Sequence, residues 1–431
     1  MFLLLAMTLL QCSTPEKKEQ KKIQDIISRM TLQQKAELVV GTGMDWYVPE
    51  GVPDSLLGNL LMMMRIPQGF DSSYIAAVNK LRTNCPGSSG NTMEFPELGI
   101  TSMVLSDGPA GLRIAPERKG EEGTFYSTAF PIGTNLASTW DTQLVNEIGK
   151  AMGNEVLEYN SDIILGPGLN LQRDPLCGRN FEYYSEDPLV TGKMAAAIIN
   201  GVQSNGVGNS AKHFAANNQE TNRFTVNTIV SERALRELYL RGFEIAVKEA
   251  QPLTVMSSYN LINGTYASES HDLLTKVLRD DWGFKGYVVT DWGGGSDAAA
   301  QMKAGNDMIQ PGPGQALEII KAVENGDLDI AVLDKNIARI LSVMFKLPKY
   351  RNYQASNRPD LQAHAGVTRR AAAEGMVLLK NDGMALPLGS DISKVALFGI
   401  TSYELISGGT GSGDVNEAYT ISLPEALKAN S

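Results

Sequence analysis

The feature that most constrains the fold is a repeated alternation of short apolar runs with helical segments. Each run is apolar or β-branched and ends in Gly, Pro, Asn or Asp. The residues that follow have helical periodicity, as in DTQLVNEIGKAMGNEVLEY. Eight such runs occur along the chain: NLLMMMR (59–65), TSMVLSDGPAG (101–111), AFPIGTNLAS (129–138), DIILGPGLNLQ (162–172), GNSAKHFAANN (208–218), LTVMSSYN (253–260), GYVVTDWGG (286–294) and NDMIQPG (306–312).

Eight strands that alternate with helices predict an α/β fold, specifically a (β/α)8 TIM-like barrel. An open doubly wound sheet is the rival architecture. That fold needs a glycine-rich phosphate turn after an early strand, and the sequence has none.

The residues after the repeat indicate a second domain. The stretch after Ile340 is rich in Tyr, Asn, Arg and Pro, as a linker along a surface would be. A predicted helix and strand follow in HAGVTRRAAAEGMVLLKND, and KVALFGI then leads into the glycine-rich GGTGSGDVN. We therefore expect an export signal and tether at 1–22, the barrel at 23–345, a linker at 346–364 and an incomplete N-terminal part of an α/β sandwich domain at 365–431.

Charge and the positions of Cys and His argue against two kinds of partner. The 38 basic and 48 acidic residues leave a formal charge of −10 with no long basic run, which argues against nucleic acid. The three cysteines and three histidines are scattered, so we expect no metal site. Their positions leave open whether Cys85 and Cys177 pair or are buried thiols.

The first residues, MFLLLAMTLLQC, form an apolar run that is too short to span a bilayer. We expect this run to be an export signal, with a lipid on Cys12 as the only membrane attachment. A truncated or mis-started signal peptide is the alternative. Both interpretations predict a location outside the cytoplasm, either in the periplasm or anchored to the membrane.

The ends of the predicted strands carry charged and polar residues. In a barrel, the carboxyl ends of the strands line one common mouth. A carboxylate directly after the apolar run GYVVT, Asp291, is costly to bury unless it meets donors or performs chemistry. Neighbouring cations can keep such a carboxylate ionised. The other residues at this mouth are Asp107, Arg173, Arg179, Lys212, His213, Glu220, Arg223, Tyr259 and Trp292.

From about residue 23 onward the sequence resembles glycoside hydrolase family 3, and in particular its multidomain β-glucosidases. The strings LSDGPAGLR, GRNFEYYSEDP, AKHFAANNQETNR and VVTDWGG carry the resemblance, because all four occur in family order and at family-like spacing. The resemblance implies that Asp291 is the nucleophile. It also implies sugar contacts in the −1 subsite from Asp107, Arg179, Lys212, His213, Arg223, Tyr259 and Trp292, with Ser412 of the GGTGSG loop as a further contact.

The resemblance implies a retaining exo-β-glucosidase that needs no cofactor. Retaining glycosidases use two carboxyl groups about 5–5.5 Å apart, one as nucleophile and one as acid/base. In the glucosidases that this chain resembles, the acid/base is a Glu of the second domain, so we expect it beyond Ser431. The bacterial N-acetylglucosaminidases use a His–Asp pair after the KHF string, and AANNQETNR contains no second His. A β-xylosidase of the same family and a catalytically impaired sugar-binding fragment are the alternatives.

Several of these residues have a structural alternative. An Asp after a strand is often a helix N-cap, but its neighbours at the mouth favour catalysis for Asp291. Arg173 and Arg179 could instead pair with acidic residues and so fix a long loop; the acidic residues nearby are Glu182, Glu186 and Asp187. We favour this structural role for Arg173 only.

Three further residues are ambiguous in the same way. Glu220 is either a substrate ligand or the residue that orients Arg223. His271, in the first turn of a predicted helix, and His364, in the predicted linker, are expected to be structural.

Overall fold

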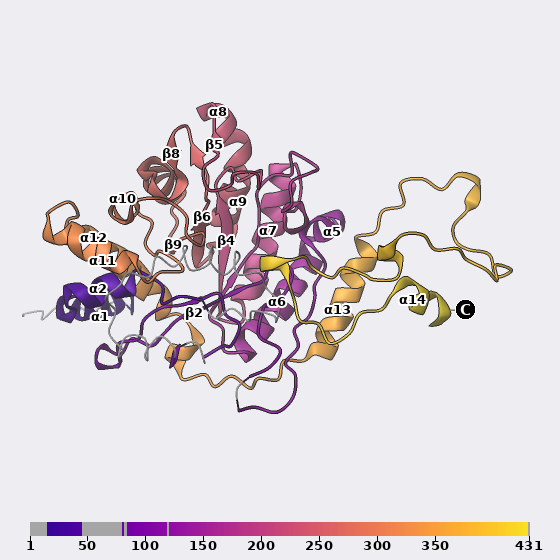
Figure 1. The fold of residues 1–431 in the computed structure, drawn as a ribbon, viewed down its shortest axis with the longest axis horizontal. Helices are drawn as coiled ribbons and strands as arrows, with labels where there is room; N and C mark the ends of the chain where they lie inside the picture. Colours follow the sequence, from indigo (N-terminus) through magenta and orange to yellow (C-terminus); the bar gives the residue numbers. More distant parts are fainter. Residues whose placement is uncertain (1–14, 45–79, 82–83, 119, 430–431) are drawn as a thin grey trace, which may run out of the picture.

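A computed structural model describes residues 15–44, 80–81, 84–118 and 120–429 (Figure 1). The strands are β1 Gly90–Asn91, β2 Val104–Asp107, β3 Ile163–Leu165, β4 Gly208–Phe214, β5 Asn227–Thr228, β6 Thr254–Ser257, β7 Leu261–Ile262, β8 Thr265–Tyr266 and β9 Tyr287–Thr290. The α-helices are α1 Pro15–Arg29, α2 Leu32–Leu38, α5 Gly133–Ser138, α6 Thr142–Glu158, α7 Pro188–Gln203, α8 Glu232–Ala234, α9 Arg241–Ala250, α10 Ala298–Ala304, α11 Gln315–Glu324, α12 Ile330–Met344, α13 Leu361–Glu374 and α14 Leu423–Ala429.

Shorter or wider helical turns lie between these elements. The 3₁₀ turns are η1 Pro96–Leu98, η2 Asn180–Glu182, η4 Ala267–Glu269, η6 Pro348–Arg351, η7 Asp382–Met384, η8 Ile400–Ser402 and η9 Gly411–Gly413. The π-helical segments are η3 Leu235–Tyr239 and η5 Asp272–Asp281. None of the helices in the described ranges is long and apolar enough to cross a membrane.

The main sheet curls into a ring. Its order is β1-β2-β3-β4-β6-β9, with β1 antiparallel to β2 and the later neighbours parallel. Beyond β9, Val289 pairs with Met308 and Ile309 pairs with Val40, both in parallel bridges. The amide N–H of Thr42 then donates to the carbonyl of Asn91 in β1 at 3.0 Å. Within the described residues the ring therefore has eight members and is closed by backbone hydrogen bonds.

This ring confirms the α/β barrel-like class but corrects its membership. The predicted strand at 129–138 is wrong, because α5 occupies its second half. The predicted strand at 59–65 lies outside the described residues. Residues 40–42 and β1 are members of the described ring that the sequence did not predict. The predicted strand at 306–312 contributes only bridges.

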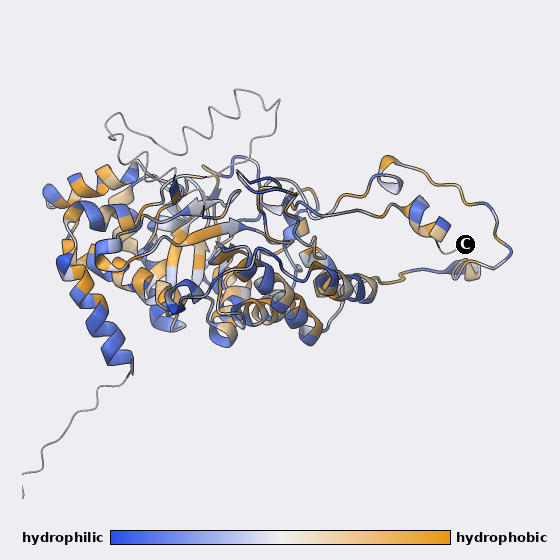
Figure 2. Ribbon diagram, turned by 90° about the horizontal axis from the view of Figure 1, so that it is seen from below, coloured by the Kyte–Doolittle hydropathy of each residue, from blue (hydrophilic) through white to orange (hydrophobic). Residues whose placement is uncertain are grey.

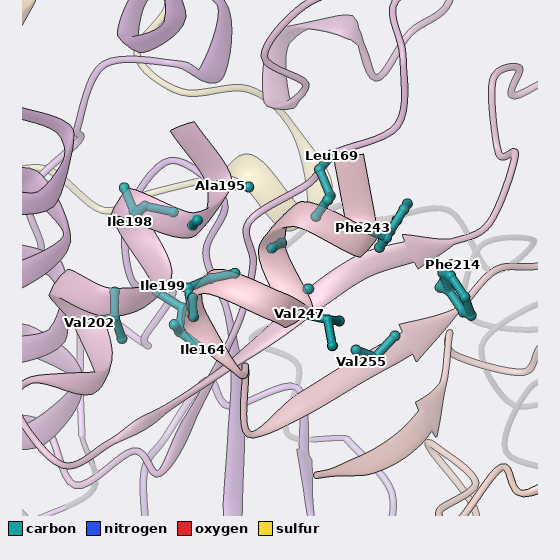
Figure 3. Packing of buried hydrophobic residues seen from close by; sticks show 14 of the residues in the cluster. Ile164, Leu169, Ala195, Ile198, Ile199, Val202, Phe214, Phe243, Val247 and Val255 are labelled. Atoms are coloured by element: carbon teal, nitrogen blue, oxygen red, sulfur yellow. The ribbon is translucent and has the colours of Figure 1, made fainter. Parts of the chain in front are cut away.

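The helices cover the ring from outside because each has one apolar face. Helices α7 and α9 pack against the strands β3, β4 and β6, as Figure 3 shows for Ile199 and Val247 against Ile164 and Val255. A second cluster joins α1, α2, α11 and α12 to the other side of the ring. Asp side chains at 141, 187, 297 and 329 accept from the first N–H groups of α6, α7, α10 and α12 and so fix where these helices begin.

Both predicted ends of the barrel differ from the structure. The expected boundary at residue 22 falls inside α1, which packs on α12: Glu19 accepts from Ser342 of α12, and Lys22 lies over the ring of Phe345, directly after α12. Cys12 lies outside the described residues, so export and lipid attachment stay predictions. Likewise, α13 begins at Leu361, inside the predicted linker.

No strand is formed in the described chain beyond residue 340. The predicted strands in MVLLKND and KVALFGI are therefore wrong as local structure. The apolar side chains of these two stretches are largely exposed to solvent, with Leu379 91% and Phe398 86% exposed. Figures 1 and 2 show this segment extending away from the barrel with apolar residues along it. Its assignment to a sandwich domain stays a prediction.

Helices α6 and α7 cross closely because glycines face each other at the contact. A Cβ on Gly201 would lie 2.3 Å from the carbonyl oxygen of Asn146 and 2.8 Å from the Cα of Gly149. We expect Gly201→Ala to destabilise the protein by about 1–3 kcal/mol, because overpacking outweighs the better helix propensity of Ala. Gly366→Ala in α13, where a Cβ meets nothing within 4 Å, should instead stabilise by about 0.5–1 kcal/mol. Chemical denaturation of both variants measures this, and equal effects would contradict the crossing argument.

Candidate active site

A cavity of about 370 Å³ opens where the parallel strands end. Asp107 ends β2, Lys212 lies in β4, Tyr259 follows β6, and Asp291 and Trp292 follow β9. The full lining is Met44, Asp107, Arg113, Gly178, Arg179, Phe181, Lys212, Glu220, Arg223, Met256, Tyr259, Asp291, Trp292, Thr410, Gly411 and Ser412.

Asp291 presents one carboxylate oxygen that makes no hydrogen bond of ordinary length within the described protein, although the Tyr259 hydroxyl lies close to this carboxyl group. Its Oδ1 accepts from the backbone N–H of Trp292 at 2.8 Å. Its Oδ2 has no such donor and lies 3.6 Å from His213 Nε2 and 3.9 Å from Arg179 Nη1. Burial raises the pKa of Asp291, while Arg179, Lys212 and the Trp292 N–H oppose that rise. The result is a buried carboxylate of raised basicity that faces a cavity.

His213 is a fixed, buried ring beside this carboxylate. Asn170 holds its backbone on both sides, by accepting from the His213 N–H at 2.8 Å and donating to the His213 carbonyl at 2.9 Å. Ring Nδ1 lies 3.3 Å from both the Tyr183 hydroxyl and Asn170 Oδ1. Burial, aided by the cations Arg179 and Lys212, lowers the pKa of His213 well below its ordinary value. The imidazole is therefore neutral at ordinary pH.

Two cations share one buried carboxylate. Arg179 Nε pairs with Glu182 Oε1, and Lys212 Nζ lies 3.6 Å from Glu182 Oε2. Burial alone would raise the pKa of Glu182, but Arg179 and Lys212 outweigh burial and hold that pKa below its ordinary value. Arg179 and Lys212 line the cavity, whereas Glu182 lies behind them.

Ser89, beside β1, fixes two further cavity residues. Its hydroxyl donates to Asp107 Oδ2 at 2.8 Å, and its carbonyl accepts from the indole N–H of Trp292 at 2.8 Å. Arg113 Nη1 lies 3.9 Å from the same Asp107 oxygen. Ser89 thus fixes the positions of both the Asp107 carboxylate and the Trp292 indole in the cavity wall.

Glu220, Arg223 and Tyr259 form another wall. Arg223 Nη1 donates to Glu220 Oε2 at 2.9 Å, and its guanidinium lies 4.9 Å from the ring centre of Tyr259. Burial and the nearby Asp291 raise the pKa of Tyr259 well above its ordinary value, so its hydroxyl stays protonated. Glu220 holds Arg223, as one of its two predicted roles requires, and it also lines the cavity; contact with a substrate stays a prediction.

Ser412 reaches the cavity from a loop that docks on the barrel. Asn416 holds this loop, because its carbonyl accepts from Ser127 N–H at 2.9 Å and its amide donates to the Phe125 carbonyl at 2.7 Å. Phe181 lies against the same loop, where a Cβ on Gly409 or Gly413 would come within 2.7 Å of its ring. The loop therefore needs glycine at these two positions to place Ser412.

The structure brings the predicted site residues together. Asp291 and seven of the predicted contacts line one cavity, and the remaining predicted contact, His213, lies beside Asp291. Sequence reasoning missed Phe181 and placed Glu182 only among the possible partners of a loop. The sequence offers no signal for the role of Glu182, because its burial and the two cations beside it become visible only in the fold.

The residues expected to be structural lie elsewhere. Arg173 does not pair with the acidic cluster; it contacts the hydroxyl of Tyr239. His364 Nδ1 lies 2.8 Å from Glu155 Oε1. Cys85 and Cys177 are both free thiols. In the described ranges, no group of three or more His, Cys, Asp or Glu side chains is placed to hold a metal.

Comparison with known proteins gives the family. The glycosyl hydrolase family 3 N-terminal domain matches residues 101–343. The chain belongs to glycoside hydrolase family 3. β-Glucosidase B of Emericella nidulans is 42% identical over 349 residues, which are 78% of this chain and 40% of that protein. The thermostable β-glucosidase B of Acetivibrio thermocellus is 43% identical over 345 residues, 78% of this chain and 45% of that protein.

Other members of family 3 extend the comparison. An exo-α-(1→6)-L-arabinopyranosidase of Bifidobacterium longum is 44% identical over 296 residues, 68% of this chain and 39% of that protein. The structure of β-glucosidase 3B from Thermotoga neapolitana in complex with glucose superposes with a TM-score of 0.83 at 48% identity, covering 95% of this chain and 54% of that one. The chain thus spans about half, or less, of the length of these family 3 proteins.

Proposed function

We propose that this chain carries the nucleophile and the glucose-binding cavity of a retaining exo-β-glucosidase. The observation that carries the proposal is the free Oδ2 of Asp291, which faces a cavity lined by cations and by the indole of Trp292. The arrangement supports double displacement: Oδ2 bonds to the anomeric carbon as the bond to the leaving oxygen breaks, and that oxygen departs as an aryloxide anion or takes a proton from the general acid. Water then adds to the anomeric carbon, which frees the sugar and the Asp291 carboxylate and releases a proton.

The surrounding residues suit a sugar ring. Lys212 and Arg179 can donate charged hydrogen bonds to ring hydroxyls, which are about twice as strong as neutral ones. Asp107 can accept from two adjacent hydroxyls, and Trp292 can cover the apolar C–H face of the ring. We assign the general acid to none of the described cavity residues, because Asp107 is engaged by Ser89 and Arg113, and Glu220 by Arg223.

We favour a terminal non-reducing β-D-glucosyl residue as the substrate. The β-glucosidase names of most of the relatives support a hexose. A β-xylosidase, whose substrate lacks the 6-hydroxymethyl group, is the alternative within the class, and a sugar-binding protein without turnover is the alternative outside it. Rates on matched aryl β-glucoside, β-xyloside and α-L-arabinopyranoside separate these substrates, and the first should be highest.

Covalent labelling tests the nucleophile. A 2-deoxy-2-fluoro-β-glucoside with a dinitrophenolate leaving group should esterify Asp291, because fluorine slows both steps and the leaving group restores only the first. Intact mass should rise by one fluoroglucosyl unit per chain, and peptide mapping should place it on Asp291. A label on Asp107 or Glu220 would refute the assignment. No label, despite measurable glucose binding, would favour a sugar-binding protein.

A further inference from the structure

Glu182 carries a buried charge that pairs with two residues of the cavity lining, although Glu182 does not itself line the cavity. It ends η2 and is 3% exposed. Its two oxygens meet different cations, Arg179 from the preceding loop and Lys212 from β4. A buried carboxylate is expensive unless its partners compensate it, and here both partners line the cavity.

Arg179 lies between two carboxylates. Its Nε pairs with Glu182, while its Nη1 is 3.9 Å from Asp291 Oδ2, beyond hydrogen-bonding distance. The stronger contact is thus made on the side away from the free oxygen of Asp291. If Glu182 carried no charge, Asp291 would become the strongest nearby attraction for the guanidinium.

We propose that Glu182 is a positioning residue for the attack of Asp291 on the sugar. Its carboxylate holds Arg179 and Lys212 at the cavity wall as sugar donors and keeps Arg179 from capping the oxygen that must bond to the anomeric carbon. This inference rests on the proposed glycosidase function and adds a second requirement to it, a buried counter-charge behind the donors.

The rate and its pH dependence should change together when this charge is removed. The groups that face Asp291 are Arg179, Lys212, His213, Arg223 and Tyr259. Replacing the Glu182 anion by a neutral amide leaves those cations less compensated, so the ionised form of Asp291 is favoured and its pKa falls. A more stable carboxylate, partly capped by Arg179, is a weaker nucleophile.

The experiment uses Glu182→Gln and Glu182→Asp in the full chain, with the rate of labelling by the 2-fluoro-glucoside measured from pH 3.5 to 8. For Glu182→Gln the plateau rate should fall roughly 10- to 100-fold, as when a preorganised electrostatic group is lost. The acid limb of its pH–rate profile, where the rate falls as Asp291 becomes protonated, should move to lower pH. Glu182→Asp keeps the charge and should leave the acid limb in place while recovering part of the rate.

Glu155→Gln is the matched control, because Glu155 is an equally buried carboxylate that pairs with His364 away from the cavity. It should lower the melting temperature without moving the acid limb. A Glu182→Gln protein whose rate is merely scaled down, with the acid limb unmoved, would overturn the positioning role.

A crystal structure of Glu182→Gln provides a test that needs no turnover. The expected result is Arg179 within hydrogen-bonding distance of Asp291 Oδ2. Finding Arg179 and Lys212 in their present positions would refute the proposal even if the wild-type chain is never labelled. Failure of wild-type labelling alone would instead count against the glycosidase function.

Discussion

Replacing Asp291 with Asn is expected to lower kcat/KM on a dinitrophenyl β-glucoside by at least about 10⁴-fold, since loss of a nucleophile removes the covalent route altogether. The amide has the same shape but cannot form the ester. Because burial raises the pKa of Asp291, the ionised carboxylate costs folding stability at pH values above that raised pKa. Asn removes this cost, so the melting temperature at neutral pH should stay the same or rise. Dinitrophenolate release and thermal unfolding measure the two effects.

Asp297→Asn is the control for this variant. Asp297 lies six residues further along and caps α10 by accepting from Ala300 N–H at 2.9 Å, a role that Asn fulfils equally well. Its kcat/KM should match the wild-type value. If Asp291→Asn retained more than a tenth of the wild-type rate, a different carboxylate would have to be the nucleophile.

Lys212→Ala is expected to cost about 2–4 kcal/mol of transition-state stabilisation, as the loss of one preorganised donor typically does. Lys212 is 1% exposed, so no water replaces its charge at low cost. The decrease should appear mainly in kcat/KM for the labelling reagent and for aryl glucosides. Arg179 continues to compensate Glu182 in this variant, so the melting temperature should fall only moderately although a buried ion pair is broken.

Lys35→Ala separates the two kinds of buried lysine. Lys35 is also buried and pairs with Asp334 at 2.6 Å, but this pair joins α2 to α12 and lies outside the cavity lining. Its loss should lower the melting temperature and leave kcat/KM unchanged. A Lys212→Ala protein with a near-normal rate and a collapsed melting temperature would show that Lys212 is structural.

The sequence predicts most of the ring because its members are apolar runs with strong β-propensity. The central strands, such as YVVT and TVMS, need only their own composition to be recognised. Strand β1 is a Gly-Asn pair with no such propensity, and only its bonds to Thr42 and to β2 make it a member. The error at residues 129–138 runs the other way: a strand is predicted there, but GTNLAS also has little β-propensity and forms the helix α5.

The sequence places most of the cavity lining, although the roles of those residues stay predictions. A charged residue near the end of an apolar strand is expected at the mouth of a barrel, so the sequence alone predicts the location of Asp107, Lys212 and Asp291. The role of Glu182 could not be predicted in this way, because it depends on which cations a 3₁₀ turn brings within reach. Phe181 was missed for the same reason: its position depends on the glycines at 409 and 413, far away in sequence.

The closure of the ring has a consequence for biosynthesis. Val40 and Ile309 pair although they lie at opposite ends of the barrel sequence, and Thr42 joins this pair to β1. Residues 40–42 thus have two neighbours in the ring, β1 and the segment at Ile309. During translation, residues 40–42 leave the ribosome long before the segment at Ile309 has been made. Contacts of such large sequence separation form slowly because the chain between them must lose its freedom first. We expect a nascent chain that has not yet passed residue 309 to expose an open sheet edge, to associate with chaperones and to resist proteolysis only after that point.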